Sequence, residues 1–429
     1  MTQMQNSDEP DLPTMTPLDA DTARAGMRDR AQEIFLAGVK AADPALAVEE
    51  ALVGHSFHMP MIVAVGKAAR RMAAAAMKHL QADPVIVVTN YENAAPLPGA
   101  EVLAAGHPVP DAAGAQAALR VEEALSHAKG DVIALISGGG SALLPAPANG
   151  VSLDDKAEVN RLLLGSGADI TVMNLVRQQL SRLKGGGLLR AAAPAKVTAL
   201  ILSDVVSDDL RAIASGPTIA PIGTRAEAAA ALRELGIWDR LPAAVRAHLG
   251  RGEVDLGPLP ESTADLIGSN KLSVAAMARF AGGGAADGVH VFPIPLEGDV
   301  AEAAKTIVES AKTPGIYLFG GETTVRVTGD GLGGRNQELA LRVATLAEAA
   351  GLSDYVFLSG GTDGRDGPTD AAGAIVDPGT LGRMRAAGLE PEEVLARNDS
   401  YHGLAAAGDL LRIGATGTNV ADLQVLIRC

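Results

Sequence analysis

Short apolar runs alternate with longer amphipathic segments along most of the chain. Residues 61–65, 85–89 and 132–136 are almost entirely apolar, which is typical of strands buried on both faces. The segments between them repeat apolar residues at three- and four-residue spacing, as helices with one buried face do. Strands that alternate with helices in this way predict a parallel sheet with right-handed crossover connections.

The same alternation restarts in the second half of the chain. Between residues 249 and 264, glycines, prolines and charged residues gather without periodicity, which indicates a domain boundary. A chain of 429 residues is also too long for one ordinary core. We therefore predict an α/β protein with a larger Rossmann-like α/β/α domain at residues 22–258 and a smaller α/β domain at residues 259–429. In the smaller domain, strands are expected at residues 290–293, 316–319, 324–327, 355–358, 374–376 and 421–427.

The first 21 residues differ from the rest of the chain. They are polar and acidic, contain Pro10, Pro13 and Pro17, and lack the basic start and apolar core of a signal peptide. We expect a disordered tail at residues 1–21. A helix is expected at residues 22–42, where apolar residues return at helical spacing.

Three of the predicted strands lead into glycines, two of them through a serine, and polar residues follow. Glycine allows the backbone to approach a ligand closely, and a helix that starts after such a loop offers free N–H groups to an anion. Carboxyl ends of parallel strands share one edge of a sheet, where ligands bind. Phosphate binding is therefore expected here, although each loop alone could be a tight turn without a ligand. The candidate residues are Ser137, Gly138, Gly139, Gly140 and Ser141 after the first strand, and Gly321, Glu322 and Thr323 after the second; Gly360 and Gly361 follow the third.

Two cations occupy unusual positions for surface residues. Lys67 follows a buried strand in a Gly-Lys pair, where it could reach a phosphate or simply pack its stem on the sheet. It is not the lysine of a P-loop, because Ala68 stands where that motif needs a hydroxyl. Arg335 opens a helix, followed by Asn336, at the end where the helix dipole disfavours a cation. An anion is therefore expected beside Arg335.

Acidic residues follow two of the predicted strands. Asp204 ends the strand at residues 197–202, and Asp363 lies in the loop after the strand at residues 355–358. Mg²⁺ in phosphate sites is held by one or two carboxylates, so these two are the candidate metal ligands. Asp366 and Asp370 fit the turn-forming role that aspartate plays in loops.

Charge and composition exclude several classes of function. The net charge of −15 disfavours binding to nucleic acid or to an anionic membrane. The single cysteine, Cys429, permits no internal disulfide, which fits a cytoplasmic protein. No histidine pair has metal-ligand spacing, and no loop satisfies the dinucleotide fingerprint or the nucleophile elbow of a serine hydrolase.

Eight motifs, in order from about residue 25 onward, resemble the glycerate 2-kinase family. This is the class II glycerate kinase group with a C-terminal MOFRL domain, and some of its members are named hydroxypyruvate reductases. The motifs are Val65-Gly-Lys67, Ile136-Ser-Gly-Gly-Gly-Ser-Ala-Leu-Leu144, Leu183-Lys-Gly-Gly-Gly187, Leu202-Ser-Asp-Val205, Ser215-Gly-Pro217, Gly320-Gly-Glu-Thr-Thr324, Gly333-Gly-Arg-Asn-Gln-Glu338 and Gly361-Thr-Asp-Gly-Arg-Asp-Gly-Pro-Thr-Asp370.

The resemblance implies ATP- and Mg²⁺-dependent phosphorylation of D-glycerate to 2-phosphoglycerate, in a cleft between two α/β domains. It also implies that Lys67 and Arg335 are key site residues, in agreement with the reading of the residues themselves. Asp204 is expected to bind Mg²⁺ or to accept the proton of the attacking hydroxyl. An NAD(P)H-dependent hydroxypyruvate reductase and a non-catalytic sensor of sugar acids or nucleotides are the alternatives. The protein is expected to act as a monomer or homodimer.

Overall fold

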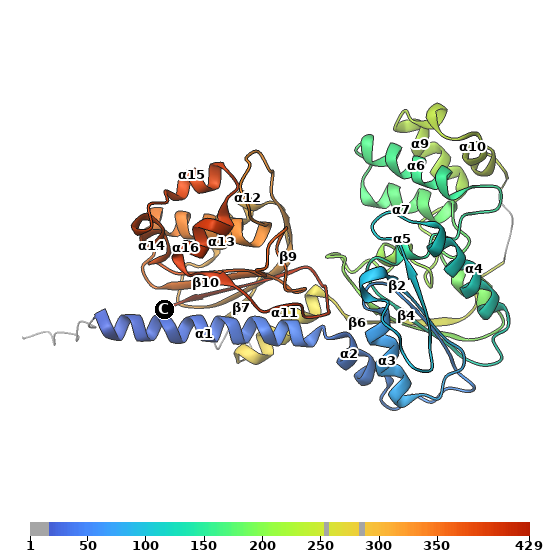
Figure 1. Cartoon of the computed structure of the whole chain (residues 1–429), viewed down its shortest axis with the longest axis horizontal. Coiled ribbons are helices and arrows are strands. Elements are labelled where there is room, and N and C mark those ends of the chain that lie inside the picture. Colours follow the sequence, from blue (N-terminus) through green and yellow to red (C-terminus); the bar gives the residue numbers. More distant parts are fainter. Residues whose placement is uncertain (1–16, 253–256, 283–287) are drawn as a thin grey trace, which may run out of the picture.

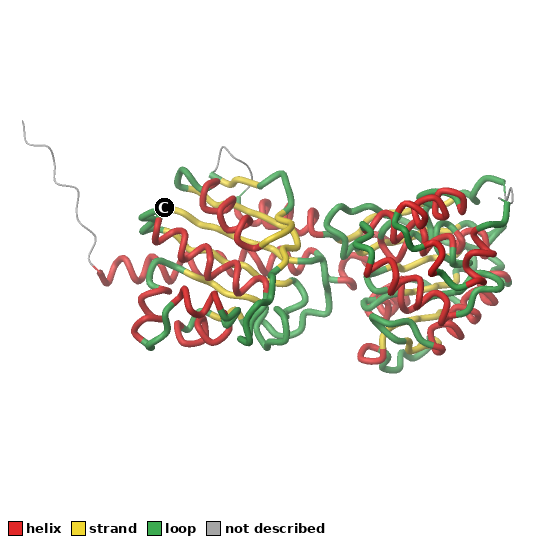
Figure 2. The backbone as a smooth tube through the Cα atoms, turned by 90° about the horizontal axis from the view of Figure 1, so that it is seen from above, coloured by secondary structure: helices red, strands yellow, loops and turns green. Residues whose placement is uncertain are grey.

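The computed structural model describes residues 17–252, 257–282 and 288–429. Two α/β units, each with its own sheet, lie next to one another (Figure 1). Seen from above, the strands of each unit lie between helices (Figure 2). The predicted fold class, with two α/β domains, is therefore confirmed.

The N-terminal sheet is parallel throughout, and its order β3-β2-β1-β4-β5-β6 is that of a doubly wound Rossmann fold. Its central strands are buried on both faces, since Val63 contributes to one apolar core and Ile62 to another. This double burial explains why the strands appear in the sequence as continuous apolar runs. The strands are β1 (Met61–Val65), β2 (Val85–Asn90), β3 (Glu101–Ala105), β4 (Val132–Ile136), β5 (Val197–Leu202) and β6 (Ser262–Gly268).

Helices cover both faces of this sheet, and four further helices form a separate cap. Helices α2 (Pro44–Leu52) and α3 (Ala69–His79) contribute to the core on one face. Helices α4 (Ala112–Ser126) and α8 (Gly187–Ala192) contribute to the core on the other. The cap has its own apolar core and lies at the upper right of Figure 1. It consists of α6 (Leu153–Gly165), α7 (Ile170–Gln179), α9 (Arg225–Glu234) and α10 (Ala243–Leu249).

The C-terminal sheet is mixed and has the order β12-β11-β10-β13-β9-β7, with β8 paired to β9. The last strand, β13, runs antiparallel between β9 and β10, so its first residue meets the carboxyl ends of both. Its strands are β7 (Val289–Val291), β8 (Leu296–Asp299), β9 (Gly315–Thr324), β10 (Tyr355–Gly361), β11 (Gly373–Val376), β12 (Leu410–Leu411) and β13 (Asp422–Arg428).

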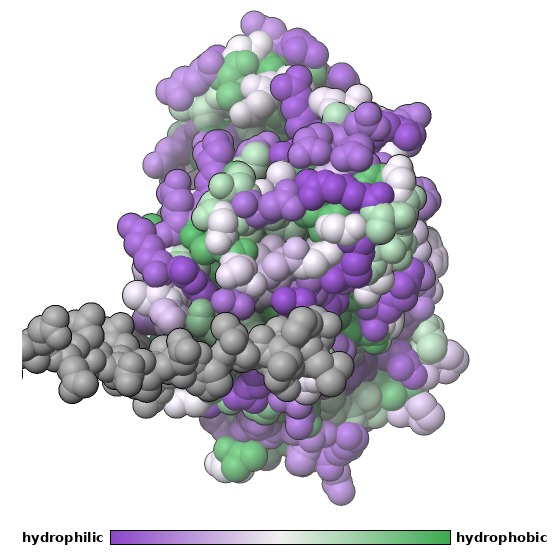
Figure 3. All heavy atoms as spheres, turned by 90° about the vertical axis from the view of Figure 1, so that its left-hand side faces the viewer, coloured by the Kyte–Doolittle hydropathy of each residue, from purple (hydrophilic) through white to green (hydrophobic). Residues whose placement is uncertain are grey.

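Helices also cover both faces of the C-terminal sheet. Helices α12 (Val300–Ser310), α13 (Arg335–Ala349), α14 (Thr380–Ala386), α15 (Pro391–Ala396) and α16 (Ser400–Ala407) pack on one face. Helices α1 (Pro17–Ala41) and α11 (Asn270–Ala281) pack on the other. The end of this domain is mostly hydrophilic, with small apolar areas between the polar residues (Figure 3). No helix within the described ranges combines the length and the apolar character needed to span a membrane.

The two sheets exchange elements across the predicted boundary at residues 258 and 259. Strand β6, which lies beyond that boundary, pairs with β5 in the N-terminal sheet. Helix α1, at the other end of the chain, packs against the C-terminal sheet. The helix predicted at residues 22–42 begins at Pro17, inside the predicted tail, and residues 1–16 lie outside the described part of the chain.

Two local predictions in the C-terminal domain are wrong. The expected strand at residues 324–327 is absent, and β9 instead runs from Gly315 through Thr324. Its glycine pair lies inside the strand rather than in a loop, because Gly321 pairs with both Leu296 and Asp422. The Gly360-Gly361 pair likewise lies inside β10. Both pairs still lie at the carboxyl ends of their strands.

Phe35 anchors helix α1 to the C-terminal sheet and offers a test of that packing. Its ring is fully buried and lies against Gly360 of β10, where an added Cβ would be 2.9 Å from the ring. We expect Phe35→Ala to destabilise this domain by about 3–5 kcal/mol, whereas Leu36→Ala, at a 39% exposed neighbour, should cost about 1 kcal/mol or less.

Urea unfolding can locate this effect, because the single tryptophan, Trp238, packs against the cap of the other domain. Phe35→Ala should lower the midpoint seen by circular dichroism more than the midpoint seen by tryptophan fluorescence. Equal shifts in the two signals would contradict the assignment of α1 to the C-terminal unit.

Candidate active site

The ends of β1 and β4 form the N-terminal half of the site. The N–H of Ser137 donates to the carbonyl of Val65 (2.9 Å), and the N–H of Lys67 donates to the carbonyl of Gly138 (2.9 Å). Gly66 has φ +127°, and a Cβ there would lie 2.2 Å from the Ser137 hydroxyl, so only glycine fits. Ser137 is buried, and its Oγ accepts from the N–H of Ala68 (3.1 Å). Ser137 therefore joins the two loops and does not face a ligand.

The glycine loop keeps free donors at the sheet edge. Within the described structure, the N–H groups of Gly138, Gly139 and Gly140 donate no recorded hydrogen bond. Gly139 is left-handed at φ +84°, and such turns of consecutive N–H groups form concave anion sites. The helix expected behind the loop is only one turn long, α5 (Gly140–Leu143), so the free N–H groups rather than a long helix dipole favour an anion here.

Lys67 and His107 stand on either side of the glycine loop. A Cβ at Gly139 would lie 3.2 Å from Cγ of Lys67 and 3.1 Å from Cδ2 of His107. Lys67 is exposed and forms no ion pair with any described residue. Burial, and then the charge of Lys67, lower the pKa of His107, which favours its neutral form. The free cation at this edge is therefore Lys67.

Asp204 follows β5 and lies directly against the glycine loop. A Cβ at Gly138 would lie 2.0 Å from Oδ2 of Asp204, so glycine is needed for this contact. Burial raises the pKa of Asp204, while Lys67 lowers it and Glu322 raises it. Glu322 belongs to β9 of the C-terminal domain, so both domains contribute charge around Asp204.

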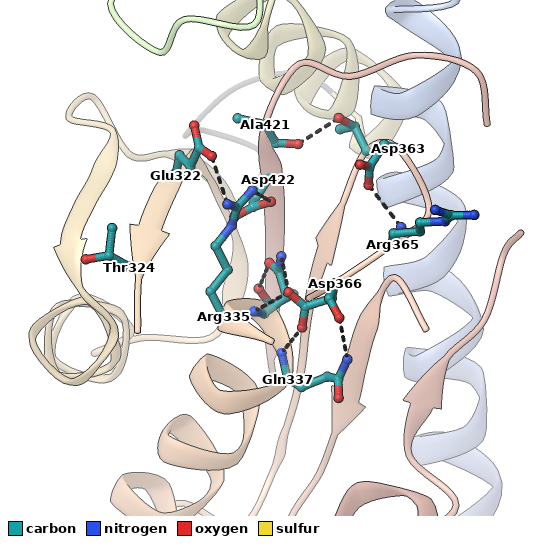
Figure 4. Close-up of polar contacts among 12 residues, drawn as sticks. Glu322, Thr324, Arg335, Gln337, Asp363, Arg365, Asp366, Ala421 and Asp422 are labelled. Atoms are coloured by element: carbon teal, nitrogen blue, oxygen red, sulfur yellow. Dashed lines mark hydrogen bonds and ion pairs between the residues drawn. The ribbon is translucent and has the colours of Figure 1, made fainter. Parts of the chain in front are cut away.

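Arg335 is the centre of the C-terminal half of the site (Figure 4). Its Nε and Nη2 donate to the two carboxylate oxygens of Asp422 (2.6 and 3.0 Å), and its Nη1 donates to Oε1 of Glu322 (2.8 Å). Although burial lowers the pKa of Arg335, Asp422 and Glu322 raise it, so the guanidinium stays charged. The anion expected beside this helix start is thus, in part, a carboxylate of the chain itself.

Asp422 is the functional candidate that the sequence did not identify. It is 0% exposed and opens β13, where it pairs with Gly321 on one side and Gly361 on the other. Burial raises its pKa, and the hydrogen bond and charge of Arg335 lower it. The available signal was an acidic residue at the start of a mostly apolar strand, because a buried carboxylate needs a partner.

Asn336 and Asp366 hold the start of α13 in place. Asp366 accepts from the N–H groups of Asn336 (3.1 Å) and Gln337 (2.8 Å), and the Asn336 amide oxygen accepts from the hydroxyl of Ser359 (2.6 Å). Burial raises the pKa of Asp366 to about 6 although these hydrogen bonds lower it. The side chain of Asn336 is buried and directed toward the sheet.

The remaining predicted binding residues differ in whether they face the site or the interior of the protein. Glu322 is exposed at the site, whereas Thr323 points inward and its buried hydroxyl has no recorded partner in the described structure. Gly321 has φ +151°, and a Cβ there would lie 2.2 Å from the Leu296 carbonyl, so it allows β8 to pair closely. Ser141 lies behind the glycine loop, and its Oγ is 2.9 Å from Oγ of Ser215.

The site has few acidic residues, which is enough only for an ion such as Mg²⁺ that needs one or two carboxylates. No cluster of three or more His, Cys, Asp or Glu side chains suited to a metal ion occurs in residues 17–252, 257–282 and 288–429. Mg²⁺ that arrives with a nucleotide needs only one or two carboxylates, so Asp204 fits it. The Oδ1 of Asp363 accepts from the N–H of Arg365 (2.9 Å). Asp363 lies beside Gly361, as Asp422 does, so it belongs to the C-terminal half of the site.

The N-terminal domain has the Rossmann strand order and a glycine loop with free N–H donors. The second domain presents an arginine and carboxylates. Together they define a two-domain α/β enzyme for anionic substrates. Residues 30–250 match a family model described as "Domain of unknown function (DUF4147)", and residues 315–422 match the MOFRL family. The chain belongs to the glycerate 2-kinase family, as its motifs predict.

Relatives with solved structures share the whole architecture. The chain is 39% identical to the D-glycerate 2-kinase of Thermotoga maritima, over 93% of this chain and 98% of that protein. It is 38% identical to the glycerate 2-kinase of Pyrococcus horikoshii, over 91% and 94%. A crystal structure of the Thermotoga maritima glycerate kinase superposes with a TM-score of 0.87 at 37% identity, covering 94% of this chain and 100% of that chain.

Some relatives bear a different name. A protein of Agrobacterium vitis, 40% identical over 92% of this chain and 93% of its own length, is named as a hydroxypyruvate reductase on provisional grounds. The reductase alternative therefore has a specific observation in its favour.

Proposed function

We propose that this protein is a glycerate 2-kinase, which transfers the γ-phosphoryl group of ATP to the 2-hydroxyl of D-glycerate and gives 2-phosphoglycerate and ADP. Its relatives support this reaction. The observation that carries the proposal is the set of free donors at the carboxyl edge of the N-terminal sheet. The N–H groups of Gly138 to Gly140 lie beside Asp204 and the exposed Lys67, and the C-terminal domain adds Arg335, which is bound to Glu322.

Phosphoryl transfer asks a protein mainly to position its substrates and to offset charge on the transferring group. In this proposal, Lys67, Arg335 and the N–H groups of Gly138 to Gly140 face the phosphate oxygens. The 2-oxygen of glycerate attacks the γ-phosphorus as the bond to the β-phosphate oxygen breaks. Asp204 accepts the proton of the hydroxyl, and its raised pKa makes it a stronger base than an ordinary aspartate.

Asp204 is also the first candidate for holding Mg²⁺, with Asp363 as the second. The ion, when bound with ATP, offsets negative charge on the phosphate oxygens. The Asp204 carboxylate accepts from its own backbone N–H and from no side chain of the described residues, so it keeps lone pairs for either role.

The second candidate function is reduction of hydroxypyruvate by NAD(P)H. The strand order is compatible with a dinucleotide fold, but the loop after β1 reads Val65-Gly66-Lys67-Ala68 and lacks the glycine fingerprint. At Gly66, Ser137 leaves no room even for a Cβ. These features support the kinase over the reductase.

The test is phosphate transfer from ATP-Mg²⁺ to D-glycerate, with the product identified by ³¹P NMR. A 2-phosphoglycerate signal is the expected result. A 3-phosphoglycerate signal would overturn the position of attack. If neither product forms and NADH is oxidised by hydroxypyruvate in the same preparation, the reductase is favoured.

Gly138→Ala tests the contact between the glycine loop and Asp204. The added methyl group would lie 2.0 Å from Oδ2 of Asp204, so the carboxylate must move by an ångström or more. A displacement of this size in an active site lowers turnover by about 10²-fold. We expect this loss in kcat with little change in the circular dichroism spectrum.

Gly165→Ala is the matched control. Gly165 is exposed, and nothing lies within 4 Å of an added Cβ. Its kcat should equal that of the unaltered protein. Full activity in Gly138→Ala would show that the position of Asp204 against the loop does not matter for the reaction.

A further inference from the structure

A cavity of about 450 Å³ opens beside the glycine loop, on the side of the cap. Gly139 and Ser141 line one end of it, and three cationic side chains line another part. These cations are Lys156 of α6, Arg177 of α7 and Lys184, which follows α7. No function was predicted from the sequence for any of these three residues.

None of the three cations forms an ion pair with an acidic residue in the described structure, and all their partners are neutral. The ammonium of Lys184, a residue only 7% exposed, donates to the carbonyl (2.9 Å) and the hydroxyl (2.7 Å) of Ser141. The ammonium of Lys156 donates to the carbonyls of Pro145 (2.7 Å) and Leu180 (3.1 Å).

Arg177 completes the group, and its neighbours show how unusual the group is. The Nε of Arg177 donates to the amide oxygen of Asn160 (3.1 Å). Arg182, close to Lys156 but not in the cavity, is bound by both carboxylate oxygens of Glu122. Arg161, at the exposed rim of the same cavity, is bound by Glu158. Among the described cations in and around this cavity, only the three inner ones lack a counter-charge.

Cations in such a position repel one another and lose hydration. Burial, and then the charges of Arg182 and Arg177, lower the pKa of Lys156 to about 7. Burial, followed by the charges of Lys156 and Arg177, lowers the pKa of Lys184 well below its usual value. Two lysines and an arginine that only satisfied neutral oxygens would not need to gather in one cavity, because buried charges ordinarily come with partners. The cluster therefore suits an anion from outside the chain.

The walls of the cavity indicate what kind of anion. Pro108, Val109, Ala142 and Leu164 line it, and Val109 and Leu164 are exposed apolar side chains. A three-carbon acid is nearly all polar and would leave most of this volume unfilled. A nucleotide combines a flat apolar base with a polyphosphate chain, so it matches both parts of the lining.

We propose that this cavity is the nucleotide site, with the base and ribose against the apolar wall and the polyphosphate chain over Lys156, Arg177 and Lys184. The proposal rests on the use of a nucleoside triphosphate by the proposed reaction. Gly139 joins the cavity to the reaction centre, because its position touches both the cavity and the stem of Lys67. The terminal phosphate thus reaches the glycine loop, and glycerate approaches from the side of Arg335.

Lys156→Met tests this assignment with little risk to the fold. Methionine keeps the length of the stem, and both carbonyls retain another donor: the N–H of Ala148 for Leu180 (3.0 Å) and the hydroxyl of Ser181 for Pro145 (3.2 Å). In calorimetric titration with ADP, the affinity should fall at least tenfold. The Tm of the free protein should rise, because an uncompensated buried charge has been removed.

Lys129→Met is the matched control, since Lys129 is an exposed lysine of the same domain that does not line the cavity. Its ADP affinity should stay within twofold of the unaltered protein. If Lys156→Met leaves ADP affinity unchanged and lowers Tm, the cluster is structural and the proposal is wrong. If it weakens glycerate and not ADP, the cavity holds the acid and the proposal is also wrong.

Calorimetry with ADP requires no turnover, so this test is separate from the test of the reaction. ADP binding that depends on Lys156, in a protein that makes no 2-phosphoglycerate, would keep the nucleotide site and refute the kinase. Normal kinase activity, with ADP binding unchanged by Lys156→Met, would keep the kinase and refute the nucleotide site.

Discussion

Arg335→Met is expected to lower kcat for glycerate phosphorylation by about 10²- to 10³-fold, the usual loss when one preorganised donor to a developing charge is removed. The Arg335 side chain is 34% exposed, so one part of it can face a substrate while Nε and Nη2 hold Asp422. The measurement is steady-state kinetics with both substrates. If the contact is made only in the transition state, kcat and kcat/KM should fall together.

The same substitution is expected to reduce stability, for a separate reason. Asp422 is 0% exposed, and without Arg335 it becomes a buried charge with no cation. Loss of one partner of a buried pair costs about 3–5 kcal/mol. A lower activity could therefore reflect a damaged sheet rather than a missing charge.

The double variant Arg335→Met/Asp422→Asn separates the two effects. It removes the unpaired charge while nearly keeping the shape of the buried side chain, so much of the stability should return and activity should not. Arg335→Lys should also stay impaired, since lysine cannot make the paired hydrogen bonds of a guanidinium. Recovery of kcat in the double variant would show that Arg335 acts only by holding β13.

Much of the N-terminal domain could be predicted, because its strands are buried on both faces and so stand out as apolar runs. The C-terminal sheet was harder, since β13 inserts between β9 and β10 from the far end of the chain. That insertion turns the Gly320-Gly321 pair into part of a strand. Periodicity likewise showed that α1 has a buried face, but not which of the two sheets covers it.

The candidate site likewise contains residues that could be predicted from the sequence and residues that could not. Lys67 and Asp204 were found because each directly follows a buried strand, so their position depends on local sequence and sheet direction alone. Asp422 was missed because its partner, Arg335, is 87 positions away. Lys156 and Lys184 look like ordinary surface lysines until the fold brings α6 of the cap and the segment after α7 together beside the glycine loop. Ser137 and Asn336 lie at the right places, but their side chains point into the protein.

Lys67→Met is expected to lower kcat by about 10²- to 10³-fold and to leave stability nearly unchanged. Lys67 is exposed and has no ion-pair partner among the described residues, so its removal leaves no buried charge behind. Lys78→Met is the matched control: Lys78 belongs to the same domain, is 65% exposed and pairs with Glu49, and its loss should not affect kcat. Unfolding midpoints of both variants should match the unaltered protein.

The pH dependence of Lys67→Met can also separate the two roles open to Asp204. The positive charge of Lys67 lowers the pKa of the Asp204 carboxyl, so its removal must raise that pKa. If Asp204 is the proton acceptor, the acidic limb of the kcat profile moves to higher pH, because a carboxylate must be ionised to accept a proton. If Asp204 holds Mg²⁺ instead, saturating Mg²⁺ should abolish the shift, because the ion competes with the proton for the same oxygens. A limb that stays in place at both low and high Mg²⁺ would remove Asp204 from the reaction and leave Lys67 acting on the phosphate alone.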